Sequence, residues 1–90
     1  MATLDTVKTA LRIRHQELDG EITRLIGAAQ ASMVRAGVAP IIVQTGGQLV
    51  TQAIVTYCLM NMTEEKGLID KYAEAYDIQV DGIRRASNVQ

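Results

Sequence analysis

The fold is decided by the last third of the chain, 68-LIDKYAEAYDIQVDGIRRAS-87. Apolar residues recur in this stretch at spacings of three, four or seven, which is the period of one face of an α-helix. The residues that form this apolar stripe are Ile69, Tyr72, Ala73, Tyr76, Val80 and Ile83. Most positions on the opposite side are charged. We therefore predict an amphipathic helix over about residues 67–86.

The same apolar period predicts three further helices upstream of this stretch. The first is expected at about residues 3–13, with Thr3 as its N-cap. The second is expected at about residues 18–36 and stops at Gly37, which we predict to be the left-handed C′ residue. The third, at about residues 48–62, is apolar on most sides. Such a helix is expected at the centre of a bundle.

The connection between the second and third helices, residues 38–47, is unusually apolar. Pro40 prevents continuation of the preceding helix, and the β-branched residues Ile41, Ile42 and Val43 that follow it favour strand geometry, so we predict an extended conformation. An apolar segment of this kind either covers the core or contacts another chain. The sequence leaves both interpretations open.

Ninety residues are enough for one domain, although a chain of this length buries a comparatively small core. We predict a single all-α domain of four helices over residues 1–90, with a loose tail at residues 87–90. Because the chain is so short, stabilisation by oligomerisation is expected, and the core material is aliphatic, with neither Phe nor Trp. Cys58 lies in an apolar run and is interpreted as a small buried hydrophobe, in keeping with synthesis in a reducing compartment.

Charge and motif content argue against several functional classes. A net charge of −1 does not give the general basic character of a nucleic-acid-binding protein. The single histidine, His15, lies in a polar turn, and no histidine or carboxylate spacing predicts a metal site. The sequence also lacks a secretory signal and any apolar stretch near the roughly 20 residues that span a bilayer. We expect no catalytic residue, no metal, no cofactor and no membrane contact.

Several segments together carry a resemblance to a known family. They are 3-TLDTVKTALRI-13, followed by a polar turn and 25-LIGAA-29, then 52-QAI-54 and 76-YDIQVDGIRRAS-87. This order of segments resembles the small head-tail connector proteins of tailed bacteriophages. The turn at residues 14–19, RHQELD, departs from the acid-rich turn of many family members.

The resemblance implies a structural virion protein that is made in the host bacterial cytoplasm and resides at the head-tail junction. Its subunits would form a ring of about twelve copies. The ring would dock on the portal protein after DNA packaging and provide a platform for the stopper or tail-completion protein. Packaged DNA would pass through the ring without sequence-specific binding.

We assign hypothetical contact residues to three groups, for contacts between subunits, with the portal, and with DNA in the channel. In that order, the groups are Ile41, Ile42 and Val43; Ile83, Arg84, Arg85 and Val89; and Lys8, Arg12 and Arg14. For the basic group, the residues themselves favour the solvated end of a helix over contact with DNA. The alternative function is a small helical DNA-binding or regulatory protein, which predicts duplex affinity and a fixed dimer.

Overall fold

The computed structural model describes residues 4–45 and 47–88, and these residues form helices joined by short turns. The helices of this part of the chain are α1 (Leu4–Leu11), α2 (Asp19–Arg35), α3 (Pro40–Thr45), α4 (Gly47–Met62) and α5 (Lys66–Asn88). No strand is present among the described residues, so the predicted all-α class is confirmed. The predicted N-cap Thr3 lies outside the described residues.

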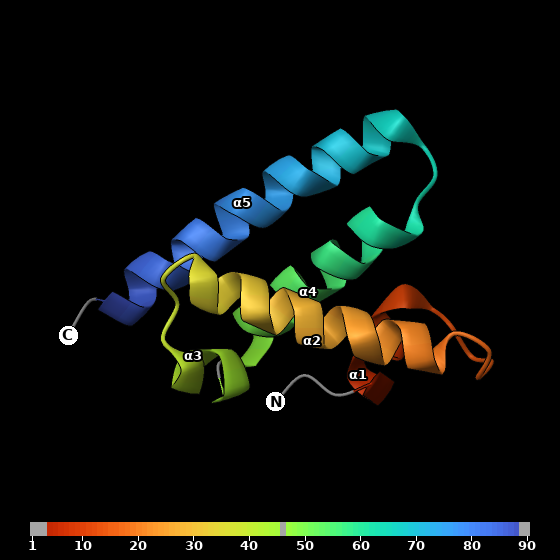
Figure 1. The fold of residues 1–90 in the computed structure, drawn as a ribbon, viewed down its shortest axis with the longest axis horizontal. Helices are drawn as coiled ribbons and strands as arrows, with labels where there is room; N and C mark the ends of the chain where they lie inside the picture. The colour runs from red at the N-terminus through yellow and green to blue at the C-terminus, as the bar shows by residue number, and fades with distance from the viewer. Residues whose placement is uncertain (1–3, 46, 89–90) are drawn as a thin grey trace.

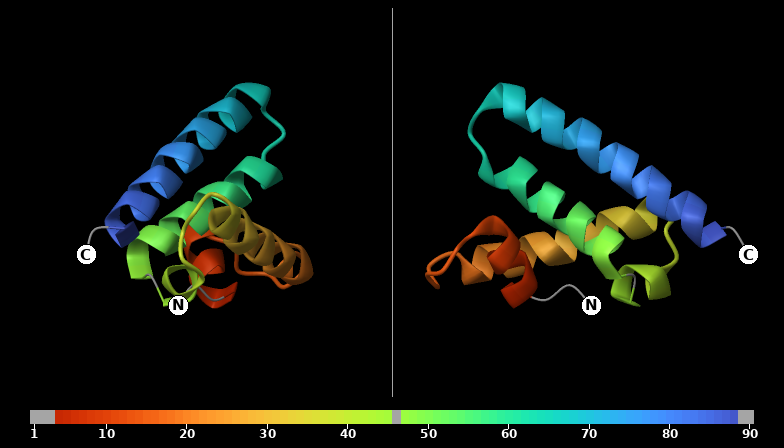
Figure 2. Two further views of the ribbon diagram at one scale, coloured as in Figure 1. Left: turned by 60° about the vertical axis from the view of Figure 1, so that its left-hand side comes forward. Right: turned by 180° about the vertical axis from the view of Figure 1, so that it is seen from behind.

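The helices are arranged around α4 (Figure 1). Helices α4 and α5 form an antiparallel hairpin, and α4 lies between α5 and the pair formed by α1 and α2 (Figure 2). The short helix α3 packs against α2. The central position predicted for the third helix is therefore confirmed, because α4 contacts α1, α2 and α5. An apolar circumference is what such a position requires.

The core is aliphatic and lies where α1, α2 and α3 cover the first part of α4 and the second part of α5. Its fully buried side chains include Val7 of α1, Ile22 and Met33 of α2, and Ile54 and Cys58 of α4. Helix α5 contributes the second half of its apolar stripe, namely Tyr76, Val80 and Ile83. The Tyr76 ring lies 5.3 Å from that of Tyr57, measured between centroids. The predicted burial of Cys58 is also confirmed.

Two helices end in the same hydrogen-bonding motif. After α2, the amide of Gly37 donates to the Val34 carbonyl at 3.1 Å and that of Val38 to the Met33 carbonyl at 3.0 Å, which is a Schellman motif. Gly37 has a φ of 106°, as predicted for a left-handed residue at this end. The burial of Val38 together with Met33 provides the hydrophobic contact that commonly accompanies the motif.

After α1, the motif contains an arginine at the left-handed position. The Arg12 amide donates to the Thr9 carbonyl at 3.1 Å, and the Ile13 amide donates to the Lys8 carbonyl at 2.9 Å. Arg12 has a φ of 60°, the only positive value among non-glycine residues in the described part of the chain. An L-residue other than glycine pays roughly 1–2 kcal/mol for this conformation.

The prediction of an extended connection at residues 38–47 is wrong, because residues 40–45 form α3. Pro40 is the first residue of this helix, where its fixed φ is favourable and its missing N–H costs nothing. The Ala39 carbonyl accepts the amides of Ile42 and Val43, so the turn is hydrogen-bonded despite its β-branched residues. Residues 87 and 88 of the predicted loose tail belong to α5, which continues to Asn88, and residues 89–90 lie outside the described residues.

Candidate functional site

Helix α3 separates the three residues assigned to subunit contacts. Val43 is 3% exposed and belongs to the core, whereas Ile42 is half-buried and packs against it. Ile41 is 67% exposed. The two interpretations of this segment therefore apply to different residues. Val43 covers the core, and Ile41 is an apolar side chain held at the surface by a helix that Val43 anchors.

The residues assigned to portal contacts are likewise divided by burial. Ile83 is 4% exposed and lies in the core, whereas Arg84 and Arg85 are exposed. Both arginines form ion pairs with Asp81, at 2.5 Å for Arg84 and 3.0 Å for Arg85. Val89 lies outside the described residues. Among the described residues of this group, the two arginines are therefore the ones at the surface.

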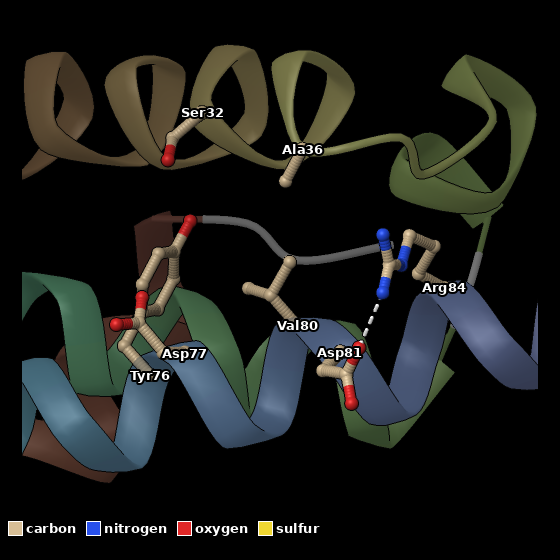
Figure 3. Close-up of a pocket in the computed structure, with 7 residues that line it drawn as sticks. All are labelled: Ser32, Ala36, Tyr76, Asp77, Val80, Asp81 and Arg84. Carbon is tan, nitrogen blue, oxygen red and sulfur yellow. Dashed lines mark hydrogen bonds and ion pairs between the residues drawn. The ribbon is translucent and has the colours of Figure 1, made fainter.

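A shallow cleft of about 210 Å³ separates α2 from α5 and was not predicted from the sequence. Tyr76 and Val80 point from α5 toward Ser32 and Ala36 of α2 (Figure 3). The Tyr76 hydroxyl donates to the Ala29 carbonyl at 3.3 Å. Burial raises the pKa of Tyr76, an effect that a hydrogen bond with Ser32 opposes. The tyrosine thus joins α2 to α5 and stays protonated at neutral pH.

The side chain of Arg84 closes the end of this cleft. Its Cδ atom lies 3.0 Å from the position that a Cβ on Gly37 would occupy. The turn between α2 and α3 is therefore covered by a cationic side chain from α5, and glycine at position 37 leaves room for it. The separation in sequence between Gly37 and Arg84 explains why the pattern of residues did not predict this contact.

The basic residues Lys8, Arg12 and Arg14 do lie together, around a surface hollow of about 460 Å³ that Thr9 and Ile13 complete. Lys8 is not free, because its Nζ atom lies 2.6 Å from Oδ1 of Asp19. This ion pair joins α1 to the first turn of α2, which has no side-chain N-cap. Arg12 and Arg14 are exposed at the hollow.

Three exposed apolar residues lie at the end of the molecule where α5 ends. Val34 at the end of α2 is 42% exposed, and Leu49 in the first turn of α4 is 59% exposed. Together with Ile41 they lie where α2 ends, α3 turns and α4 begins, near the C-terminal end of α5 (Figure 1). We call the group of residues Val34, Arg35, Ile41, Leu49 and Arg84, which lie at the end of α2, in α3, at the start of α4 and near the end of α5, the α3 end. Only Ile41 and Arg84 were candidates from the sequence.

The opposite end of the α4–α5 hairpin has a second apolar surface. We call residues 59–75, which comprise the end of α4, the turn and the first part of α5, the hairpin tip. None of its residues is buried. Among its described residues, five large apolar side chains are half-buried without packing against the core cluster. They are Leu59, Met60, Leu68, Ile69 and Tyr72.

The apolar circumference of α4 was the signal that could have found the hairpin tip. A helix that is apolar all round has to be covered on every side. Helix α2 crosses α4 away from the turn that leads to α5, so the end of α4 is covered by α5 alone (Figures 1 and 2). The sequence predicted a central helix, and the structure leaves the last turns of that helix at the periphery.

Metal and membrane sites receive no support from the described residues. In the ranges 4–45 and 47–88, no three His, Cys, Asp or Glu side chains are placed to hold a metal ion. None of the helices in these ranges has the combination of length and apolar content that a membrane span requires.

Comparison of the chain with protein-family models, with curated proteins and with solved structures found no match.

Proposed function

We propose that this protein is a structural subunit of the bacteriophage head-tail connector, which forms a ring beneath the portal after DNA packaging and supports the stopper or tail. The order of sequence segments described above supports the proposal. Among the structural observations, the exposure of Ile41 carries it. The short helix α3 is fixed to the core by Val43, and it holds a large apolar side chain, that of Ile41, 67% exposed in a fixed position. Such a residue fits a contact with a neighbouring protein.

The portal contact is proposed at the C-terminal end of α5. Arg85 is the most exposed cation of the ion pairs at this end, with 77% of its side chain accessible. Its charge and its position near the end of the last helix suit a contact with an acidic surface of the portal. Ile83 supports this region from within the core and does not itself provide a contact surface.

The proposal is tested by mixing the purified protein with the portal ring encoded by the same genome. We expect co-sedimentation of the two proteins and, by electron microscopy, an added ring on one face of the portal. Arg85→Glu should weaken this binding, because it reverses a charge at the proposed contact. Arg24→Glu is the matched control, since Arg24 is also an exposed cation, 70% accessible, but lies on α2 outside the proposed contacts. Absence of portal binding by the unmodified chain would exclude the connector function.

The alternative function, a DNA-binding or regulatory protein, has one structural observation in its favour. Arg12 and Arg14 are exposed on the same hollow as Lys8. Binding of duplex DNA by the isolated protein, with affinity that falls steeply with salt, would support this alternative. Two exposed arginines supply few phosphate contacts, so the connector is the function that we favour.

A further inference from the structure

We infer that the hairpin tip of one subunit docks on the α3 end of a second copy of this chain. This inference deepens the proposed function, and it rests on that function for the expectation that the chain contacts copies of itself. The two surfaces lie at different ends of the molecule, whose longest dimension is 41 Å (Figure 1). The contact would therefore be heterologous, and repeated contacts of this kind close into a ring when the rotation between subunits permits.

The first argument is that both surfaces carry apolar side chains that remain partly accessible to solvent. The hairpin tip presents five half-buried apolar side chains that do not pack against the core cluster. The α3 end presents Val34, Ile41 and Leu49, each more than 40% exposed. Burying both sets in one contact removes apolar surface from water on each side.

The second argument is charge complementarity. The hairpin tip has four exposed carboxylates, Glu64, Glu65, Asp70 and Glu74, against two lysines. The α3 end has two guanidinium groups, those of Arg35 and Arg84, and residues 34–49 contain no carboxylate. Asp77 and Asp81 lie beside Arg84, and Asp81 also pairs with Arg85, so three arginines stand against two carboxylates near this end. Opposite net charge favours a contact between the two ends and disfavours either end meeting its own copy.

The third argument comes from the alternative arrangements. Two hairpin tips facing each other would bring together eight carboxylates against four lysines, and two α3 ends would bring together four guanidinium groups against the two Asp81 carboxylates. Like charges that face each other across an interface oppose association. A symmetric dimer through either surface is therefore disfavoured, and docking of unlike ends remains.

The test uses two variants that each disable one end. Ile41→Asp places a carboxylate on the α3 end, and Ile69→Asp places one on the hairpin tip. Both positions tolerate the change in the isolated subunit, because Ile41 is exposed and Ile69 is half-buried near the start of α5, where acidic residues are favourable. Circular dichroism checks that each variant keeps its helix content.

We expect the unmodified chain to show concentration-dependent association by sedimentation and light scattering. Each variant alone should lose about 100-fold or more in association constant. An equimolar mixture of the two should recover a dimer and nothing larger, because one intact hairpin tip meets one intact α3 end. The matched control is Ile78→Asp, since Ile78 is 66% exposed but lies outside both surfaces. This control should change association by no more than about twofold.

Three outcomes would overturn the inference. The first is a monomeric unmodified chain at concentrations up to about 1 mM. The second is undiminished association of either variant alone, and the third is a mixture that stays monomeric. Portal binding is measured separately on the unmodified chain. If the unmodified chain binds the portal but the mixture of variants stays monomeric, the connector function stands and this contact is rejected. If the mixture forms a dimer but the unmodified chain does not bind the portal, this contact stands and the connector function is rejected.

Discussion

The α4–α5 hairpin contains two regions with the same apolar pattern and different burial. In the base of the molecule, residues 4–58 and 76–86, α1, α2 and α3 cover the hairpin, and every buried residue of the described chain lies there. In the hairpin tip, residues 59–75, only the two helices face each other, and no residue is buried. The comparison teaches that an apolar stripe is buried only where a third layer covers it. Two helices alone leave their apolar residues at the edge of the contact.

The largest expected effect comes from truncating one apolar residue in each region. Ile54 is fully buried in the base, so Ile54→Ala should lower the free energy of unfolding by about 2–5 kcal/mol. Ile69 in the tip is half-buried, so Ile69→Ala should cost below about 1 kcal/mol. Urea denaturation of dilute protein measures both changes. Equal losses from the two substitutions would contradict the division into base and tip.

The second expected effect concerns Cys58, the last buried residue of α4 before the tip. Burial raises the pKa of the Cys58 thiol from 9.0 to about 11. Because the folded state holds the proton more tightly, the stabilisation is fully present below pH 9.0 and is lost as the pH rises to about 11. The expected loss from this group is about 2–3 kcal/mol.

Urea denaturation at a series of alkaline pH values measures this loss. Cys58→Ala is the matched control, because it removes the thiol and leaves Tyr76, whose pKa burial also raises. The variant should therefore lose less stability than the unmodified chain over the same pH range. An identical pH dependence in the two proteins would show that the end of α4 opens to solvent together with the tip.

A smaller effect, of opposite sign, is expected from Arg12 in the base. Arg12→Gly removes the penalty of a left-handed arginine, so it should raise the free energy of unfolding by about 1 kcal/mol. Amide hydrogen exchange then sharpens the comparison. Exchange of base amides that open only by global unfolding should slow about fivefold, while exchange in the tip stays unchanged if the tip opens by itself. A uniform slowing would indicate that the two regions unfold as one unit.

The base and the tip also differ in how far the sequence predicted them. The stripe from Ile69 to Ile83, the central α4 and the left-handed Gly37 followed from local rules, because period, composition and turn chemistry are local properties. The even spacing of the stripe did not show that Ile69 is half-buried and Ile83 buried, since that depends on which helices cover them. Burial of this kind is a long-range property.

Helix α3 shows a different limit of prediction. Six residues give little more than one helical turn, so the sequence carried no period from which to distinguish Ile41 from Val43. The strand preference of β-branched residues was outweighed by a proline at the first helical position and by the core site that Val43 fills. The contact of Arg84 with Gly37 was likewise beyond local rules, because it joins residues far apart in the chain.

The smallest expected effect on stability comes from Asp81, and it separates folding from assembly. Asp81 pairs with Arg84 and Arg85, but all three side chains are more than a third exposed. Removing such pairs by Asp81→Asn should change the free energy of unfolding by about 0.5 kcal/mol or less. The same change removes the carboxylate that pairs with Arg84 and Arg85 near the α3 end. Association with the acidic hairpin tip of another subunit should therefore strengthen, and the gain should diminish as salt is added. Sedimentation at low salt measures the change in association. Weaker association would mean that Asp81 holds Arg84 in the orientation that the contact needs. The fixed orientation of the Arg84 side chain would then matter more for the contact than the net charge of the α3 end.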